Sequence, residues 1–211
     1  MRNDDLKLSK RKANRKIEEI AKHINVQYGV DVKITYSQPN AQGCVHDNFD
    51  GDLSIDVLFM PRMEKYRLFN HVNDMDFIDA IRALYHEERH LIQNADMYQN
   101  QNPSETDVAM AIRHIACKNN RFYYMSHSNY YNDMNEIDAE GAAIVKTYNY
   151  IKSEFQNVNA DKMMLDYITK KIATSQHYFI DGTYDSFESV IDAFSAKFEK
   201  AKDAKLNYEK I

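Results

Sequence analysis

Glycine and proline are scarce in this chain, with only five glycines and three prolines among 211 residues. Because these two residues are the strongest breakers of helices, long helices can run through most of the sequence without interruption. Apolar residues recur at helical spacing, and the segments predicted to be helical are approximately 5–28, 76–98, 104–118, 133–155, 160–175 and 186–207. The chain therefore predicts a mainly helical protein.

Two short segments near the N-terminus depart from the helical pattern. Residues 30–37 alternate apolar and polar side chains, which is typical of a half-buried strand, and residues 53–60 predict a second strand. The segment 39–51 between them is polar and rich in turn-forming residues, so we expect a loop there. No linker suggests a domain boundary. The prediction is a single domain over residues 1–211, with an α+β fold that is predominantly helical and has a small antiparallel sheet near the N-terminus.

Charge and composition exclude several classes of protein. The formal net charge of -5 makes a dedicated nucleic-acid binder an unlikely interpretation, although residues 7–16 carry a basic run. We interpret that run as the solvated face of the first helix, with a patch for an acidic partner as the alternative. No stretch of about twenty apolar residues exists, so we expect no membrane span. The sequence predicts no particular oligomeric state.

The cysteines and the first residues bear on the compartment. Cys44 and Cys117 are far apart and belong to no paired motif, which argues against a disulfide framework. Cys44 and His46 could form part of a metal site, but with no second pair nearby we interpret them as loop residues. Residues 1–16 lack the apolar stretch of a secretion signal, so the expectation is a cytoplasmic protein.

The segment His86-Glu87-Glu88-Arg89-His90 lies within the predicted helix 76–98. Two histidines four residues apart project from the same face of a helix and can bind one zinc ion. Glu87 stands where a metal-bound water needs a base. On a helical wheel the apolar residues gather on the other side of this helix: Phe77, Ile78, Ile81, Leu84, Leu91, Ile92 and Ala95. The face that would bind metal is therefore separate from the face that would pack into the core.

A second helix, predicted over residues 133–155, offers acidic side chains. One stripe of this helix contains only acids and small residues, namely Glu136, Ala139, Glu140, Ala143 and Thr147. Small residues let two helices approach closely, so that one glutamate can bind zinc while the other accepts the free ring N–H of a ligating histidine. The alternative is a surface helix with ordinary acidic residues, although two alanines would be unusual on a purely solvated face.

Together, His86-Glu87-x-x-His90 and the downstream Asn135-Glu136-x-x-x-Glu140 resemble the gluzincin branch of zinc metallopeptidases. The spacing around Glu136 is also similar to the third-ligand helix of minimal intracellular zinc peptidases that cleave bacterial repressors. The resemblance implies a zincin-like fold, a Zn²⁺ cofactor and a peptide or protein substrate. It implies His86, His90 and Glu136 as metal ligands, Glu87 as general base, and Glu140 as the hydrogen-bond partner of a ligating histidine, where the family more often has aspartate.

The resemblance covers only a metal-binding core at residues 76–150, and neither the N-terminal part nor the C-terminal helices 160–207 are included. One position departs from the family pattern: Glu88 stands where an apolar residue is usual, and the helical wheel places it within the apolar face. An unpaired charge buried there would be destabilising. We therefore expect a basic residue of a neighbouring helix to pair with Glu88, with three candidates: Arg113, His114 and Arg121.

Peptide hydrolysis also requires a donor that stabilises the transition-state oxyanion. The candidates precede the third-ligand helix or follow it at a distance, and they are His127, Tyr130, Tyr131, His177 and Tyr178. Most tyrosines and histidines of a chain serve packing or the surface, so each candidate has that alternative. The strand 53–60 could offer its edge to an extended peptide substrate.

Three other functions compete with a zinc peptidase. A di-iron carboxylate bundle requires a second Glu-x-x-His unit, and Glu87-x-x-His90 is the only one in the sequence. A non-catalytic, zincin-like accessory protein could contact a partner through its basic N-terminal helix. Finally, a plain helical interaction domain could carry His86 and His90 by coincidence, which metal analysis would reveal.

Overall fold

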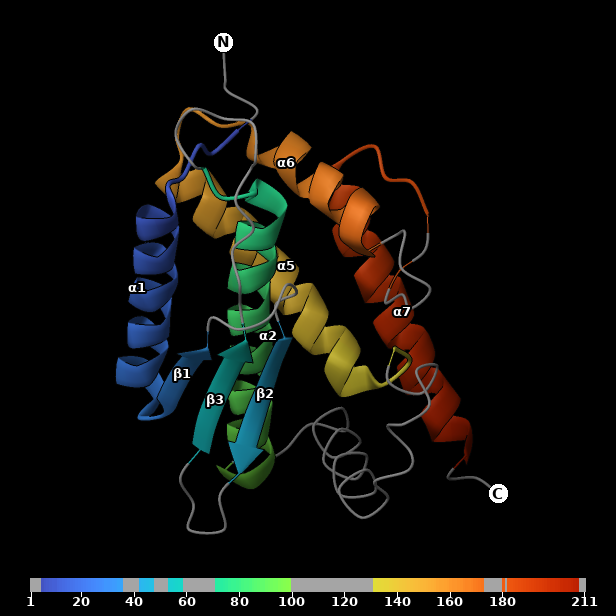
Figure 1. The fold of residues 1–211 in the computed structure, drawn as a ribbon. Coiled ribbons are helices and arrows are strands. Elements are labelled where there is room, and N and C mark those ends of the chain that lie inside the picture. Colours follow the sequence, from blue (N-terminus) through green and yellow to red (C-terminus); the bar gives the residue numbers. More distant parts are fainter. Residues whose placement is uncertain are drawn as a thin grey trace.

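A computed structural model of the chain describes residues 5–35, 42–47, 53–58, 71–99, 131–172, 180 and 182–208 (Figure 1). The described residues are predominantly helical, as predicted. The helices are α1 (Lys10–Tyr28), α2 (Asp74–Gln99), α5 (Met134–Glu154), α6 (Ala160–Tyr167) with a π-helical turn η2 (Ile168–Ile172), and α7 (Phe187–Tyr208). The predicted helix 104–118 lies outside the described residues.

Helix α1 begins later than predicted, at Lys10 rather than near residue 5, because Ser9 provides its N-cap. The backbone of Ser9 is extended, and its hydroxyl accepts a hydrogen bond from the amide of Lys12 at 3.4 Å. The helix ends at Gly29, whose φ of 67° lies in the left-handed region that glycine adopts without strain. The Gly29 amide donates to the carbonyl of Asn25 at 2.9 Å, which satisfies a terminal carbonyl.

The strands are β1 (Asp31–Thr35), β2 (Gln42–Asp47) and β3 (Leu53–Leu58), in the order β1-β3-β2. Strand β2 pairs antiparallel with β3, whereas β1 pairs parallel with β3. The prediction of an antiparallel sheet was therefore wrong for one of its two pairings. The chain reverses direction between β1 and β2 and again between β2 and β3, so β1 and β3 run in the same direction. They lie next to each other because β3 is the central strand.

The prediction of a loop over residues 39–51 was also wrong, since β2 lies within it. Cys44 and His46 are consequently strand residues, paired in register with Asp56 and Ser54 of β3. This polar segment lacks the apolar alternation that indicates a strand, and backbone pairing with β3 determines its conformation instead.

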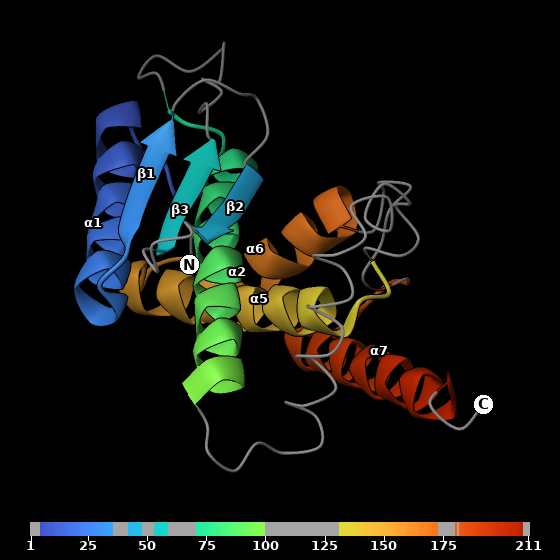
Figure 2. The same cartoon turned by 90° about the horizontal axis from the view of Figure 1, so that it is seen from below.

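Helix α2 occupies the centre of the fold (Figure 2). It is contacted by α1, by strands β2 and β3, and by α5, while α6 and α7 pack against α5. Its apolar side is buried as predicted at five positions: Phe77, Ile78, Ile81, Leu84 and Leu91. Ile92 is half-buried, and the side chain of Ala95 lies outside the described residues. Elements on both sides of α2 therefore shield its polar face as well as its apolar face from water.

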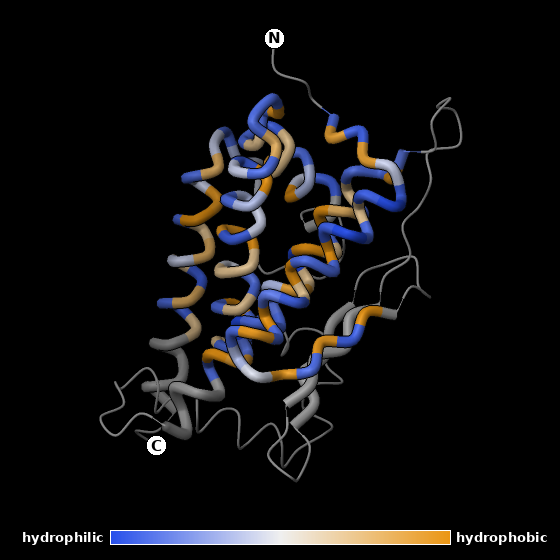
Figure 3. The backbone as a smooth tube through the Cα atoms, turned by 90° about the vertical axis from the view of Figure 1, so that its left-hand side faces the viewer, coloured by the Kyte–Doolittle hydropathy of each residue, from blue (hydrophilic) through white to orange (hydrophobic). Residues whose placement is uncertain are grey.

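Hydrophobic and hydrophilic residues alternate along the helical turns (Figure 3). The core joins the apolar stripes of several helices, and its largest fully buried side chains include Ile17 and Ile24 of α1, Ile144 and Ile151 of α5, and Tyr167 of α6. In the part of the chain that the structure describes, no helix is both long and apolar enough to cross a membrane.

Candidate metal centre

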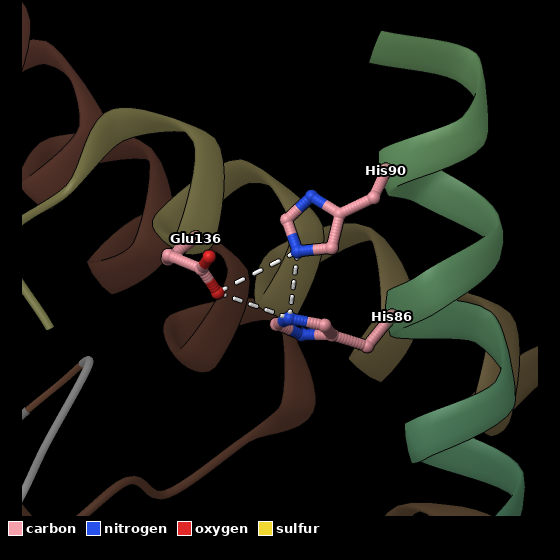
Figure 4. Close-up of side chains that lie close together, drawn as sticks. All are labelled: His86, His90 and Glu136. Atoms are coloured by element: carbon pink, nitrogen blue, oxygen red, sulfur yellow. Dashed lines mark hydrogen bonds and ion pairs between the residues drawn. The ribbon is translucent and has the colours of Figure 1, made fainter. Parts of the chain in front are cut away.

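Helices α2 and α5 bring the side chains of His86, His90 and Glu136 together (Figure 4). The Nε2 atoms of the two histidines are 3.1 Å apart. Oε2 of Glu136 lies 3.2 Å from Nε2 of His86 and 3.5 Å from Nε2 of His90. Within the described ranges, this is the one group of histidine, cysteine, aspartate and glutamate side chains arranged to hold a metal ion.

These separations fit a tetrahedral zinc site. Zinc binds imidazole nitrogen at about 2.0–2.1 Å and carboxylate oxygen at about 2.0–2.2 Å, so two ligands at tetrahedral angles lie about 3.3–3.5 Å from each other. The distance between Glu136 and His90, 3.5 Å, lies within this range, and the other two distances, 3.1 and 3.2 Å, are slightly shorter. The donor set fits as well, because two imidazoles and one carboxylate are a ligand set of catalytic zinc sites.

Helix α5 presents Glu136 because of how the helix starts and packs. Asp133 caps it by accepting from the amide of Asn135 at 2.9 Å, which places Glu136 in the first turn. Ala139 and Ala143 are each 0% exposed, and the predicted stripe of acids and small residues is buried throughout. This result confirms the close approach inferred from the small residues, since α5 makes the most extensive contact with α2.

A chain of hydrogen bonds orients His86. Its Nδ1 lies 3.0 Å from Oε2 of Glu140, and the same oxygen accepts from Nη1 of Arg82 at 2.7 Å. Arg82 in turn contacts Asp79 and the hydroxyl of Tyr167. The predicted partner of a ligating histidine, Glu140, is thus in contact with His86 and is itself held by a guanidinium.

A separate chain orients His90. Its Nδ1 lies 2.8 Å from Oε1 of Gln93. The amide nitrogen of Gln93 donates to the carbonyl of Asn135 at 2.9 Å and to Oδ2 of Asp138 at 2.7 Å. Arg89 binds both oxygens of Asp138, at 2.7 and 3.2 Å. Each histidine therefore turns its Nδ1 toward an acceptor and its Nε2 toward Glu136.

The acid–base properties of the cluster follow from these contacts. Burial lowers the pKa of His86, but its hydrogen bonds to the carboxylates of Glu136 and Glu140 outweigh burial and raise the pKa to about 10. Burial likewise lowers the pKa of His90, and its contact with Glu136 raises it above the ordinary value. Burial raises the pKa of Glu136, but the two histidines shift the pKa well below the usual range. Without a metal, the contacts with Glu136 therefore favour the protonated form of both histidines.

Glu87 follows His86 on α2 and is buried, with 6% of its surface exposed. Burial, Glu136 and His86 have the larger effects on the pKa of His90, and the carboxylate of Glu87 raises that pKa as well. Glu87 therefore lies within electrostatic reach of the cluster. The role of Glu87 as general base stays a prediction.

Glu88 is buried and paired with a basic residue of a neighbouring helix, as predicted, and within the described residues that partner is Lys146. Oε2 of Glu88 lies 2.7 Å from Nζ of Lys146 on α5, and the Glu88 side chain is 3% exposed. The candidates Arg113, His114 and Arg121 lie outside the described residues. The pairing with α5 shows that the departure from the family pattern is compatible with close packing of α2.

Of the candidate oxyanion donors, only Tyr131 lies within the described residues; His127, Tyr130, His177 and Tyr178 lie outside them. Burial raises the pKa of Tyr131, and the carboxylates of Glu140 and Glu136 raise it further, so its hydroxyl lies within electrostatic reach of the cluster.

Three residues of the hydrogen-bonded chains around the cluster were not predicted, namely Asp79, Arg82 and Gln93. A signal was present, because these residues and the two histidines are spaced three or four positions apart and so share one face of α2. Tyr167 gave no comparable signal, since it belongs to a helix far along the chain.

The fold and the cluster together define a mainly helical α+β protein with a His-His-Glu group that could hold a metal ion. Comparisons with models of protein families, with curated proteins and with solved structures found no match to this chain.

Proposed function

We propose that this protein is a cytoplasmic, zinc-dependent metallopeptidase with a zincin-like metal centre. The observation that carries the proposal is the convergence of His86, His90 and Glu136 at the separations of a tetrahedral site, with Glu87 beside them. Two imidazoles and one carboxylate favour a transition metal over calcium and magnesium, which prefer oxygen ligands throughout. Iron(II) also binds this donor set, and the His-Glu-x-x-His spacing on one helix is the reason to propose zinc. Three protein ligands also leave one coordination position for water or substrate.

In this proposal, the residues of the centre have separate roles in peptide hydrolysis. A zinc ion held by His86, His90 and Glu136 supplies Lewis-acid activation of water and of the scissile carbonyl. Glu87 takes up a proton from the attacking water and delivers it to the leaving amine. Tyr131, near the carboxylates of the cluster, is the described candidate for donating a hydrogen bond to the developing oxyanion.

An extended peptide could add to the edge of the sheet. The edge expected on residues 53–60 does not exist, because β3 is the central strand and pairs on both sides. Among the described strands, β1 and β2 are the outer ones, and β2 packs against α2, which carries His86 and His90. Strand addition at β2 is therefore the mode of substrate binding that the architecture favours.

A second candidate is a non-catalytic accessory protein that binds metal and contacts an acidic partner through the start of α1. Lys10, Arg11 and Lys12 are exposed, and among the described residues no carboxylate pairs with their side chains. By contrast, Arg15 and Lys16 pair with Glu19 and Glu154. Three cations in the first turn also oppose the helix dipole, so selection for stability alone does not explain them.

Hydrolysis of a peptide library by the zinc-loaded protein distinguishes the two candidates. The matched control is Glu87→Gln, which keeps the shape of the side chain and all three proposed ligands but removes the base. We expect cleavage by the wild type and a loss of at least about 100-fold in Glu87→Gln at unchanged zinc content. Zinc binding without cleavage of any library member would favour the accessory protein, and equal cleavage by both proteins would contradict the role of Glu87 as the base.

A further inference from the structure

We propose that Tyr167 of α6 is a positioning residue of the metal centre, acting on His86 through Arg82 and Glu140. This inference rests on the proposed function only in requiring that His86 binds a metal ion. It assigns a role to the C-terminal helices, because a residue beyond the segment that supplies the ligands would complete the centre.

The hydroxyl of Tyr167 lies in a closed set of hydrogen bonds. It donates to Oδ1 of Asp79 at 2.7 Å and accepts from Nε of Arg82 at 2.8 Å. The side chain is only 1% exposed, so water cannot replace these contacts. A phenol ring packed in the core is a rigid support, and both hydrogen-bonding capacities of its hydroxyl are used.

Arg82 transmits this constraint to the ligand. Its Nη2 lies 3.1 Å from Asp79, and its Nη1 lies 2.7 Å from Oε2 of Glu140. The guanidinium is planar, so fixing Nε and Nη2 on one side determines where Nη1 points on the other. Arg82 is therefore held at one edge by Tyr167 and Asp79 and holds Glu140 with the remaining nitrogen.

The last contact in this series is between Glu140 and the ring of His86. The oxygen of Glu140 that accepts from Arg82 is also 3.0 Å from Nδ1 of His86. A carboxylate fixed there accepts the Nδ1–H and leaves Nε2 of His86 facing Glu136. If Tyr167 loses its hydroxyl, Arg82 loses one of its fixed contacts, and the orientation of Glu140 and His86 becomes less well defined.

The test measures metal binding in three full-length variants. Tyr167→Phe removes the hydroxyl and keeps the buried ring, and Arg82→Lys keeps the charge but not the planar fork. Tyr148→Phe is the matched control, since its hydroxyl donates to Asp161 at 3.0 Å on an exposed surface. Zinc affinity comes from competition with a chelator, and the visible absorption of the cobalt-substituted protein reports ligand geometry.

We expect Tyr167→Phe to weaken zinc binding by about 3- to 10-fold and Arg82→Lys by about 10- to 100-fold, the range typical for residues that orient metal ligands. The cobalt spectrum should change in both variants and not in Tyr148→Phe. A residue with a purely structural role would lower the unfolding midpoint but leave the affinity and the spectrum unchanged. That result in Tyr167→Phe would overturn the inference while leaving the proposed function intact.

A double-mutant cycle tests the route of action. If Tyr167 acts through Glu140, Tyr167→Phe should have little further effect on zinc affinity in a Glu140→Ala background. Equal effects in both backgrounds would show that Tyr167 does not act through Glu140. Wild-type protein that binds neither zinc nor cobalt would overturn the inference and the proposed metal centre together, and so differs from failure of the inference alone.

Discussion

Oε2 of Glu140 lies 3.0 Å from Nδ1 of His86, in a contact that is buried on both sides. A carboxylate behind a ligating imidazole fixes the tautomer that leaves Nε2 free for the metal and increases the basicity of the ring. The pairing also makes Glu140 part of the centre without its being a ligand. It connects α5 to α2 at the level of the proposed metal site.

The first prediction concerns this contact. Glu140→Gln keeps the size of the side chain but removes the negative charge, so the His86 ring loses its charge-assisted partner. We expect zinc affinity to fall by about 10- to 100-fold, measured by chelator competition. Asp161→Asn on the surface of α6 is a control of the same chemical type, and it should leave the affinity unchanged. Unaltered affinity in Glu140→Gln would contradict the proposed role of Glu140.

The second prediction concerns protons released when zinc binds. Burial lowers the pKa of His86, but its contacts with Glu136 and Glu140 raise the pKa to about 10 in the metal-free protein, so the ring is protonated at pH 7.5. Metal binding requires a neutral ring, so the bound proton must leave. Because protons compete with zinc, affinity should increase as the pH rises from 6 toward 9.

Calorimetric titration in buffers with different ionisation enthalpies measures this release. We expect the apparent enthalpy to change with the buffer, with a slope of about one proton or more per zinc bound. An enthalpy that is the same in every buffer would show that His86 is already neutral before zinc binds, or that it is not a ligand.

A feature of the site could be predicted from sequence when it depends on residues close together in the chain. The His86, His90 and Glu136 pattern is local to two helices, and helical periodicity places each residue on its face. The helix predicted over 76–98 corresponds to Asp74–Gln99 in the structure. The stripe of acidic and small residues on α5 likewise predicted the face that packs against α2.

Features that depend on contacts distant in sequence could not be predicted in the same way. The requirement for a partner of Glu88 followed from its place on the apolar face, but the identity of Lys146 depends on how α2 and α5 cross. Strand β2 is defined by pairing with β3 rather than by its own residues. Tyr167 reaches Arg82 across 85 positions of sequence, and no local pattern indicates that contact.

The third prediction concerns the buried pair of Glu88 and Lys146. Lys146→Met leaves the carboxylate of Glu88 buried without its ion-pair partner, which is destabilising. We expect the free energy of unfolding to fall by about 1–3 kcal/mol, less than for a fully buried pair because the Lys146 side chain is 42% exposed. Urea denaturation monitored by circular dichroism measures the change.

Two further variants sharpen this test. Adding Glu88→Leu to Lys146→Met removes the unpaired charge and should recover most of the lost stability. Lys33→Met is the control, because the pair of Lys33 and Asp31 is about two-thirds exposed on both sides, and its loss should not change stability measurably. A double variant less stable than Lys146→Met would show that Glu88 has another role.

The metal content of the purified protein decides whether His86, His90 and Glu136 form a zinc site. Elemental mass spectrometry would compare the wild type with a variant that carries both His86→Ala and His90→Ala, with circular dichroism confirming that both proteins are folded. We expect about one zinc ion per wild-type chain and none in the variant. Wild-type protein that holds no zinc, even after incubation with zinc and removal of the excess, would contradict the proposed zinc site.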